Sequence, residues 1–388
     1  MGGHPCRCYD KSNSLWLNLV SGYIYAYKLW KFQLVYYLAT KAFSNTIRSF
    51  LATWGKSLKS RVRVVNYHKA FRQKQLPPGT YIFSDLERLS VCETEWAASI
   101  YHAISNHWGS HSKLLNHPIR SMRRYELLRA LYNRGINSHN VFRITEGRLP
   151  KRYPVFIRGA DDHGGAGTDL IHSEPDLMLE IDKLNQQGIS REDKIIVEFC
   201  DTSDEQGVFR KYSAFIVGDK IIPRHICFSR DWQIKYPDLS NPEFIEEEYE
   251  FVTRTAHEAS LKKIFAIAGI TYGRIDYGIR DNTIQVWEIN TNPRLASFVS
   301  AEIPARQTIH DIFVERINRA FETLDNDGQA MTGNVKNPLR NQLVIESVLA
   351  HAKHLGESVV FMLPFSSKVK GAMRSKLVAI KNRIQDFQ

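Results

Sequence analysis

The chain of 388 residues is too long for one ordinary hydrophobic core, so we expect two or three compact units. Its 43% hydrophobic and 24% charged residues are typical of a soluble globular protein. Only five cysteines occur, and their scatter argues against a disulfide framework and against a four-ligand zinc site, which favours a cytoplasmic location.

The net charge of +11 is unevenly distributed along the chain. Residues 1–76 contain 13 Lys and Arg against one acidic residue, and residues 331–388 contain nine against three. Residues 77–330 therefore carry a net charge of −7. Because the middle of the chain is acidic and no recognisable nucleic-acid-binding module occurs, we expect no nucleic-acid partner.

Residues 1–76 are expected to form a basic, aromatic, helical extension. Lysine and arginine interrupt its Trp- and Tyr-rich part before any run of about 18 apolar residues can build, which argues against a transmembrane span. Two interpretations stay open. Such a segment can make peripheral contact with an anionic membrane surface, or it can pack on the main body as a helical cap.

Turn-forming residues at Pro77, Pro78 and Gly79 mark the end of this extension. Strand and helix patterns then alternate, as in an α/β domain. The expected elements, in chain order, are a strand, turn and helix within 80–89, a helix after Ser121 that ends at Gly135, a strand and a glycine-rich loop within 152–171, a helix within 174–189, a strand at 194–200, a hairpin at 212–228 and a helix within 258–270.

Residues 273–293, "GRIDYGIRDNTIQVWEINTNP", are predicted to form an antiparallel hairpin. Asp281 and Asn282 favour the turn, and we expect a three-residue loop at 281–283, so that paired residue numbers sum to 564. A loop one residue shorter would move half of the polar residues to the other face of the hairpin.

With this loop, Asp276 lies opposite Glu288 and Arg274 lies opposite Asn290, and all four side chains project from one face. Two directly opposed carboxylates repel each other unless a positive charge lies between them. Carboxylate and amide oxygens are ligands that Mg²⁺ prefers, together with waters and substrate phosphates. The alternative is a solvent-exposed hairpin edge with scattered charges.

The pattern R-x-D on the first strand and E-x-N-T-x-P on the second resembles the terminal motif of the ATP-grasp superfamily. It is most similar to that of D-alanine–D-alanine ligases and their relatives. The resemblance covers roughly residues 110–300 and implies an α/β (α+β) fold in which two α+β subdomains clamp ATP. The expected units are the helical extension at 1–76, a short α/β part at 77–117, an ATP-grasp domain at 118–330 with subdomains at about 118–200 and 201–330, and a basic helical segment at 331–388.

The resemblance also implies roles for particular residues. Asp276, Glu288 and Asn290 would hold Mg²⁺ that bridges the phosphates of ATP, and Arg274 would stabilise the transferring phosphoryl group. In the family, a lysine ends the strand before the glycine-rich loop and another cation lies on the earlier helix, whereas this chain has arginine at both positions. The residues implied at ATP are Arg158, Arg124 or Arg123, Gly164, Gly165, Gly167, Glu198, Phe199 and Lys211.

Other implied positions are more general. Arg224 would contact substrate or phosphate, and His163 and His225 are alternatives for acid and base chemistry. Taken singly, several of these residues have plainer interpretations, namely a flexible glycine loop, solvent-facing arginines and a core phenylalanine.

The expected reaction is ATP- and Mg²⁺-dependent joining of a carboxylate to an amine through an acyl phosphate, with ADP as a product. The partners would be small-molecule or peptide carboxylate and amine substrates. One alternative is an ATP-grasp phosphotransferase that acts on a non-carboxylate acceptor. Another is a non-catalytic nucleotide-binding protein at a membrane surface.

Overall fold

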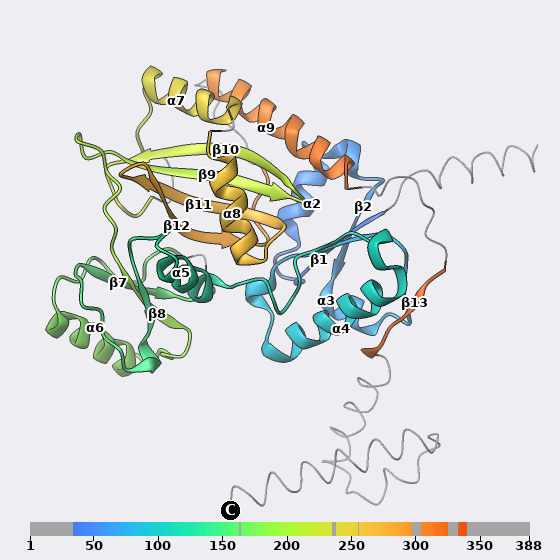
Figure 1. Cartoon of the computed structure of the whole chain (residues 1–388), viewed down its shortest axis with the longest axis horizontal. Helices are drawn as coiled ribbons and strands as arrows, with labels where there is room; N and C mark the ends of the chain where they lie inside the picture. The colour runs from blue at the N-terminus through green and yellow to red at the C-terminus, as the bar shows by residue number, and fades with distance from the viewer. Residues whose placement is uncertain are drawn as a thin grey trace, which may run out of the picture.

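The computed structural model describes residues 34–162, 164–234, 238–254, 256–296, 304–324 and 333–339. Figure 1 shows two blocks of sheet and helix stacked at the left and a third block at the right. The expected α/β class is confirmed, because the right-hand block has a parallel sheet, the other two have antiparallel sheets, and helices pack on all three. Across this described part of the chain, no helix has the length and hydropathy needed to cross a membrane.

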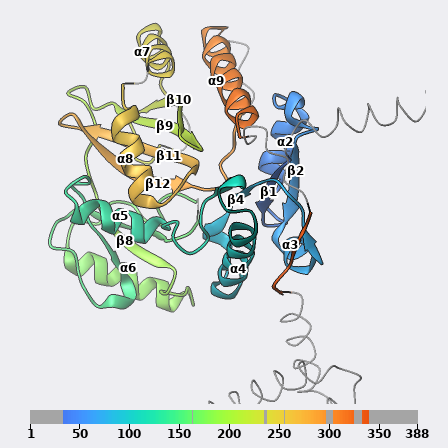
Figure 2. The ribbon, with the colours of Figure 1, turned by 45° about the vertical axis from the view of Figure 1, so that its right-hand side comes forward.

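The right-hand block is a four-stranded parallel sheet with helices on both faces, as a parallel sheet requires. Its strands, in spatial order, are β2 (Val62–Asn66), β1 (Val35–Ala39), β4 (Thr80–Phe83) and β5 (Leu114–Leu115). One face packs on α3 (Tyr67–Arg72) and α4 (Val91–Trp108), and the other on α2 (Asn45–Ala52) and α9 (Pro304–Glu322). Figure 2 shows this block edge-on beside the other two.

The described part of residues 1–76 is therefore not a helical extension, and this prediction is wrong. β1 lies inside the parallel sheet, and Ile47 and Phe50 of α2 are buried against it. The turn at residues 77–79 is not a boundary between units either, because β3 (Gln75–Leu76) pairs with β13 (Val335–Lys336) just before β4 begins. The predictions for residues 1–33 and 340–388 lie outside the described residues.

The lower left block is a three-stranded antiparallel sheet. Val155 and Ile157 of its edge strand pack on α6, so the alternate residues, Phe156 and Arg158, point away from that helix. The strands, in spatial order, are β6 (Val141–Arg143), β8 (Lys194–Glu198) and β7 (Val155–Gly159), and the helices are α5 (Arg124–Asn133) and α6 (Glu174–Gln186).

The upper left block is a four-stranded antiparallel sheet with α8 across one face (Figure 1). Ile275 and Tyr277 pack toward α8, so Arg274 and Asp276 point to the opposite face. The strands, in spatial order, are β10 (Lys220–Ser229), β9 (Phe209–Val217), β11 (Tyr272–Arg280) and β12 (Thr283–Asn290), and the helices are α7 (Pro242–Thr253) and α8 (Glu258–Ala268).

The parallel sheet meets the end of β12 at its carboxyl edge. β1 has β2 on one side and β4 on the other, so the chain reverses its winding direction between β1 and β4. Tyr37 on β1 donates a hydrogen bond to Asn292 Oδ1 (2.9 Å), and the Leu86 N–H after β4 donates to Thr291 Oγ1 (3.0 Å). The carboxyl ends of strands at such a point are where open α/β sheets bind ligands.

Candidate active site

The turn between β11 and β12 is shorter than expected. Arg280 pairs directly with Thr283, and the two residues between them, Asp281 and Asn282, have φ angles of 48° and 57°. Left-handed angles at both positions are typical of a two-residue hairpin turn. The prediction of a three-residue loop is therefore wrong.

A β-bulge restores the pairing that the shorter turn would have lost. Tyr277 pairs with Val286, but Asp276 pairs with Glu288, so Trp287 is the additional residue on β12. Beyond the bulge, Arg274 pairs with Asn290, as predicted. Trp287 and Glu288 both line the same cavity, so the bulge turns two consecutive side chains of β12 into it.

Asp276 is buried and fully hydrogen-bonded on the cavity side of β11. Its two carboxylate oxygens accept from Arg274 Nε and Nη2, both at 2.9 Å, and Oδ1 also accepts from Ser213 Oγ at 2.8 Å. The two N–H groups of one guanidinium thus hold the carboxylate in a fixed orientation. The same contact places the Arg274 charge beside the expected metal position.

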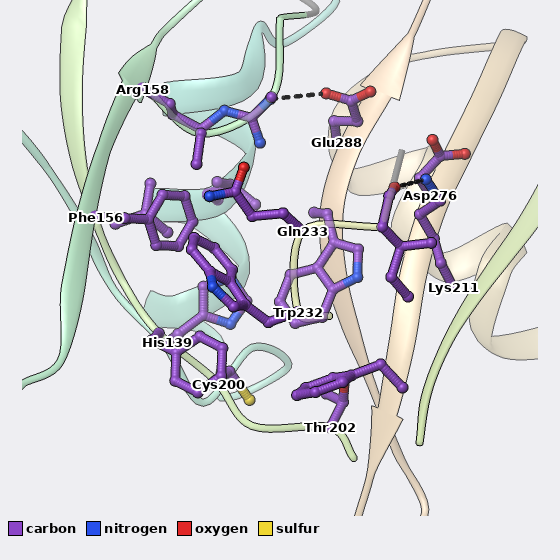
Figure 3. A pocket seen from close by; sticks show the side chains of 18 of the residues that line it. His139, Phe156, Arg158, Cys200, Thr202, Lys211, Trp232, Gln233, Asp276 and Glu288 are labelled. Atoms are coloured by element: carbon purple, nitrogen blue, oxygen red, sulfur yellow. Dashed lines mark hydrogen bonds and ion pairs between the residues drawn. The ribbon is translucent and has the colours of Figure 1, made fainter. Parts of the chain in front are cut away.

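Glu288 lies between two arginines from the lower left block. Its Oε2 accepts a hydrogen bond from Arg124 Nη2 and forms an ion pair with Arg158 Nη2 at 3.4 Å (Figure 3). Burial, together with the neighbouring Arg124, lowers the pKa of Arg158 to about 10, so this guanidinium remains charged at neutral pH. Glu288 therefore joins two sheets that lie on opposite sides of the cavity.

The structure distinguishes the two adjacent arginines at the start of α5. Arg124 is buried and donates to Gly159 O (2.8 Å), Ala160 O (3.0 Å) and Asp162 O (2.7 Å), in addition to Glu288. It does not line the cavity but lies behind Glu288, where it fixes the first residues of the glycine-rich loop.

Arg123 points to the parallel sheet instead. It donates to Leu89 O (2.7 Å) and Leu86 O (3.2 Å) and forms an ion pair with Asp161 at 3.2 Å. It therefore ties the lower left block to the parallel sheet.

The glycine-rich loop closes one side of the cavity. Gly164 and Gly165 line it, whereas Gly167 turns back to β7, where its N–H donates to Ile157 O (2.7 Å). Gly165 has φ 94°, a conformation that other residues adopt at a cost, and a Cβ on Gly159 would lie 1.8 Å from Asp162 Oδ2. His163 lies outside the described residues.

The cavity has a volume of about 520 Å³ and lies between the two antiparallel sheets. One end is aromatic. Trp232 packs on Phe156 with ring centroids 4.9 Å apart and on Phe199 at 5.6 Å, and Trp287 packs on His139 at 5.1 Å. We call this end the aromatic slot, because its rings offer surfaces on which a flat aromatic group can stack.

The other end of the cavity is charged. Figure 3 shows Arg158 on one side and Asp276, Glu288 and Lys211 on the other. Lys211 also donates to Ile234 O and so holds the segment that carries Trp232. The polar residues that line this end are Arg158, Gly164, Gly165, Lys211, Arg274, Asp276, Glu288 and Asn290.

Two predicted residues have other roles in the structure. Glu198 lines the cavity, but its Oε2 already accepts from the Asn140 N–H (2.9 Å) and from Arg152. Arg224 does not line the cavity, so its predicted contact with substrate or phosphate is not supported: its guanidinium lies 4.4 Å from the Phe313 ring centroid on α9, and burial lowers its pKa to about 10. Burial also keeps the pKa of His225 well below its ordinary value, so this imidazole is neutral at pH 7.

The residues present fit a hard divalent cation. The described chain contains no cluster of three His, Cys, Asp or Glu, so any site here consists of the two carboxylates and the Asn290 amide. Asn290 Oδ1 accepts from the Asn292 N–H (2.8 Å), which orients the amide. Two carboxylates and one amide leave coordination positions for water and phosphate, as Mg²⁺ requires.

Sequence reasoning missed most of the aromatic slot. Trp232, Trp287 and His139 come from a loop after β10, from the bulge and from the loop before β6, and only the tertiary fold brings them together. The sequence pattern could have indicated Trp287, because it immediately precedes Glu288. No local pattern marks Trp232.

If the aromatic slot binds the base of a nucleotide, Trp232→Ala should weaken that binding by about 10- to 100-fold, because base stacking on an aromatic ring contributes about 1–3 kcal/mol. The measurement is the Kd of ATP and of adenosine by calorimetry, and both should weaken by a similar factor. Tyr249→Ala, at a half-exposed residue of α7, is the control. A Trp232 variant that loses affinity for ATP but not for adenosine would contradict the base slot.

Acid should destabilise the protein through His139. Burial lowers the pKa of His139 to about 4, whereas an unfolded histidine titrates near 6.5. Between these values the unfolded chain binds a proton that the folded chain does not, so the stabilisation is complete above pH 6.5 and decreases as the pH falls. At pH 5 the loss is on the order of 2 kcal/mol. Urea unfolding at pH 7.5 and pH 5 should show a smaller pH effect in His139→Gln, and an equal effect would contradict this assignment.

Comparison with solved structures finds matches at low sequence identity and with TM-scores below 0.5. The D-alanine–D-alanine ligase from Bacillus anthracis, solved with ATP, is 12% identical with a TM-score of 0.40, and the match covers 74% of this chain and 99% of that one. A RimK domain ATP-grasp protein from Sphaerobacter thermophilus is 11% identical with a TM-score of 0.39, covering 72% and 98%. The ATP-grasp ligase PsnB, solved with a precursor variant, Mg and ADP, is 10% identical with a TM-score of 0.41, covering 72% and 97%. No family model and no curated protein matches the chain.

Proposed function

We propose that this protein is an ATP-grasp ligase that uses ATP and Mg²⁺ to join a carboxylate to an amine, with ADP and phosphate as products. The observation that carries the proposal is one cavity with an aromatic slot at one end and Arg158, Lys211 and Arg274 beside two carboxylates at the other. A nucleoside triphosphate has the same arrangement, with a flat base at one end and charged phosphates at the other.

The arginines support phosphate binding. Arg158 Nε is buried and has no hydrogen-bond acceptor among the described residues, a state that costs free energy unless an acceptor is supplied. A phosphate oxygen at the charged end would accept from it. Asp276, Glu288 and Asn290 would hold Mg²⁺, which would supply positive charge beside the phosphates, and Arg158 would contact the phosphates from the other side of the cavity.

The groups described at the charged end suit a carboxylate as the acceptor. Among the described residues that line this end, the carboxylates Asp276 and Glu288 are paired with arginine, and His139 lies at the aromatic end. A hydroxyl acceptor needs a base to remove its proton, whereas a substrate carboxylate is already ionised at neutral pH.

The reaction then has two steps. A carboxylate oxygen forms a bond to the γ-phosphorus while the bond from that phosphorus to the bridging oxygen of ADP breaks. The amine nitrogen next attacks the acyl carbon, phosphate leaves, and the nitrogen loses a proton to water. Arg274 and Arg158 stabilise the charge on the transferring group, and the glycine loop excludes water from it.

Hydroxylamine trapping tests this proposal. Purified protein with Mg²⁺, ATP, hydroxylamine and pools of amino acids and dipeptides should form both ADP and a hydroxamate, since an acyl phosphate reacts with hydroxylamine. Formation of ADP without hydroxamate would instead indicate a phosphotransferase, which transfers the phosphoryl group to an acceptor other than a carboxylate. ATP binding without any turnover across the pools would favour a non-catalytic nucleotide-binding protein.

A further inference from the structure

A second cavity lies at the carboxyl edge of the parallel sheet and is lined by basic side chains. Its volume is about 650 Å³, and it opens where β1 and β2 end. The residues that line it are Lys41, Asn66, His68, Lys69, Arg72 and Gln73. We call this cavity the basic groove.

The basic groove contains more positive than negative side chains. Lys41, Lys69 and Arg72 are exposed, and no carboxylate within the described ranges forms an ion pair with them. Two acids lie close to the groove: Glu93 at the start of α4 is 4.0 Å from the His68 ring, and Asp85, which pairs with Arg88, accepts a hydrogen bond from the Thr40 N–H (3.0 Å) beside Lys41. Residues 34–76 as a whole contain nine Lys and Arg and no Asp or Glu. A cavity with one sign of charge concentrates ions of the opposite sign.

The basic groove is linked to the candidate active site through the chain after β1. Lys41 belongs to the loop after β1, and this loop and the first turn of α2 contact Asn292, just beyond the end of β12. Asn292 Nδ2 donates to Phe43 O (3.1 Å), and Thr46 donates to Asn292 Oδ1 (2.9 Å). Asn292 follows Asn290 by two residues. Asn66, at the end of β2, lines the groove, and β2 is the direct neighbour of β1, at the usual strand spacing of about 5 Å.

We propose that the basic groove binds an anionic group of the substrate, so that the acid activated at the cavity carries at least one further carboxylate or phosphate. This inference rests on the proposed function. Arg72 offers paired N–H donors to such a group, and the two lysines offer compact charges. The position beside the hairpin favours an extended acidic substrate over a membrane surface, because one molecule can then reach both the groove and the metal site.

The test uses tri-L-glutamate as the anionic probe and tri-L-alanine as its uncharged counterpart. Binding to the full chain is measured by calorimetry at 50 mM salt with Mg²⁺ and AMPPNP present. We expect wild type to bind tri-L-glutamate at least about tenfold more tightly than tri-L-alanine. The double variant Lys69→Ala, Arg72→Ala should lose about tenfold, because two exposed charges contribute modestly. The control is Lys56→Ala, Lys59→Ala, at two exposed lysines on another surface of the same block, which should bind as wild type.

Several outcomes would overturn the inference. An equal loss in the control variant would show general charge attraction, and unchanged binding in the groove variant would show that the groove is not the site. If the groove variant instead loses only co-sedimentation with vesicles of phosphatidylserine and phosphatidylcholine, the groove contacts membranes. The proposed function fails separately: wild type with no thermal shift from Mg²⁺ and AMPPNP contradicts the nucleotide site, whatever the peptide does.

Discussion

Glu288→Gln should abolish the magnesium dependence of ATP binding and lower turnover by about 10³-fold or more, because metal and preorganised charge supply several kcal/mol at a transferring phosphoryl group. In the structure, the Glu288 carboxylate is held by Arg124 and Arg158. A metal ion must therefore compete with a guanidinium for this carboxylate. Gln keeps the size of the side chain and removes the negative charge that attracts the metal ion and the guanidinium.

The neutral side chain has a second consequence. Without the Glu288 charge, Arg158 is free to contact phosphate, so the variant should bind ATP in the presence of EDTA at least as tightly as wild type. Addition of Mg²⁺ should then bring no gain. Asp276→Asn should also lose the magnesium effect, but it leaves Arg158 paired and should not improve metal-free binding. This difference between the two variants separates metal ligation from general loss of the fold.

Calorimetry with ATP, with and without Mg²⁺, measures both effects. Asp281→Asn is a matched control on the same hairpin, because Asp281 is exposed at the turn and Asn accepts its left-handed backbone equally well. We expect the control to behave as wild type. Magnesium-dependent ATP binding that persists in both site variants would mean that the two carboxylates do not hold the metal.

The pairing of Asp276 with Glu288 was predictable from the sequence because both residues belong to one local hairpin. Asp276 and Glu288 are only twelve residues apart, and strand alternation fixes the face of each side chain. The predicted pairing is correct although the predicted turn is not. A two-residue turn shifts the register by one, and the bulge at Trp287 shifts it back. No glycine or proline marks the bulge, so the sequence gives no local reason to expect it.

The first strands of the parallel sheet were not predictable in the same way. β1 pairs with β2 and β4, which lie more than 20 residues further along the chain, and no tight turn connects them. Parallel pairing leaves no hairpin pattern in the sequence. The basic and aromatic composition of residues 1–76 therefore suggested a surface helix, whereas the apolar run Val35–Ala39 occupies a buried strand.

Of the two adjacent arginines, the sequence could not tell which one serves the site, and the structure makes the difference testable. Arg124→Met should destabilise the protein by roughly 3–5 kcal/mol, because it removes a buried guanidinium that donates to Glu288 and to the carbonyls of Gly159, Ala160 and Asp162. The glycine-rich loop and Glu288 both depend on these contacts for their position. The folded fraction of the variant should therefore also bind ATP with Mg²⁺ more weakly than wild type does.

Arg123→Met should have a smaller and different effect. Arg123 is about one-third exposed and its donors go to Leu86 O, Leu89 O and Asp161, so the expected loss of stability is about 1 kcal/mol. Its ATP affinity should stay close to that of wild type. Urea unfolding and calorimetry on both variants measure the contrast. Equal effects, or a larger loss of ATP affinity in Arg123→Met, would contradict the assignment of Arg124 as the residue that positions Glu288 and the glycine-rich loop.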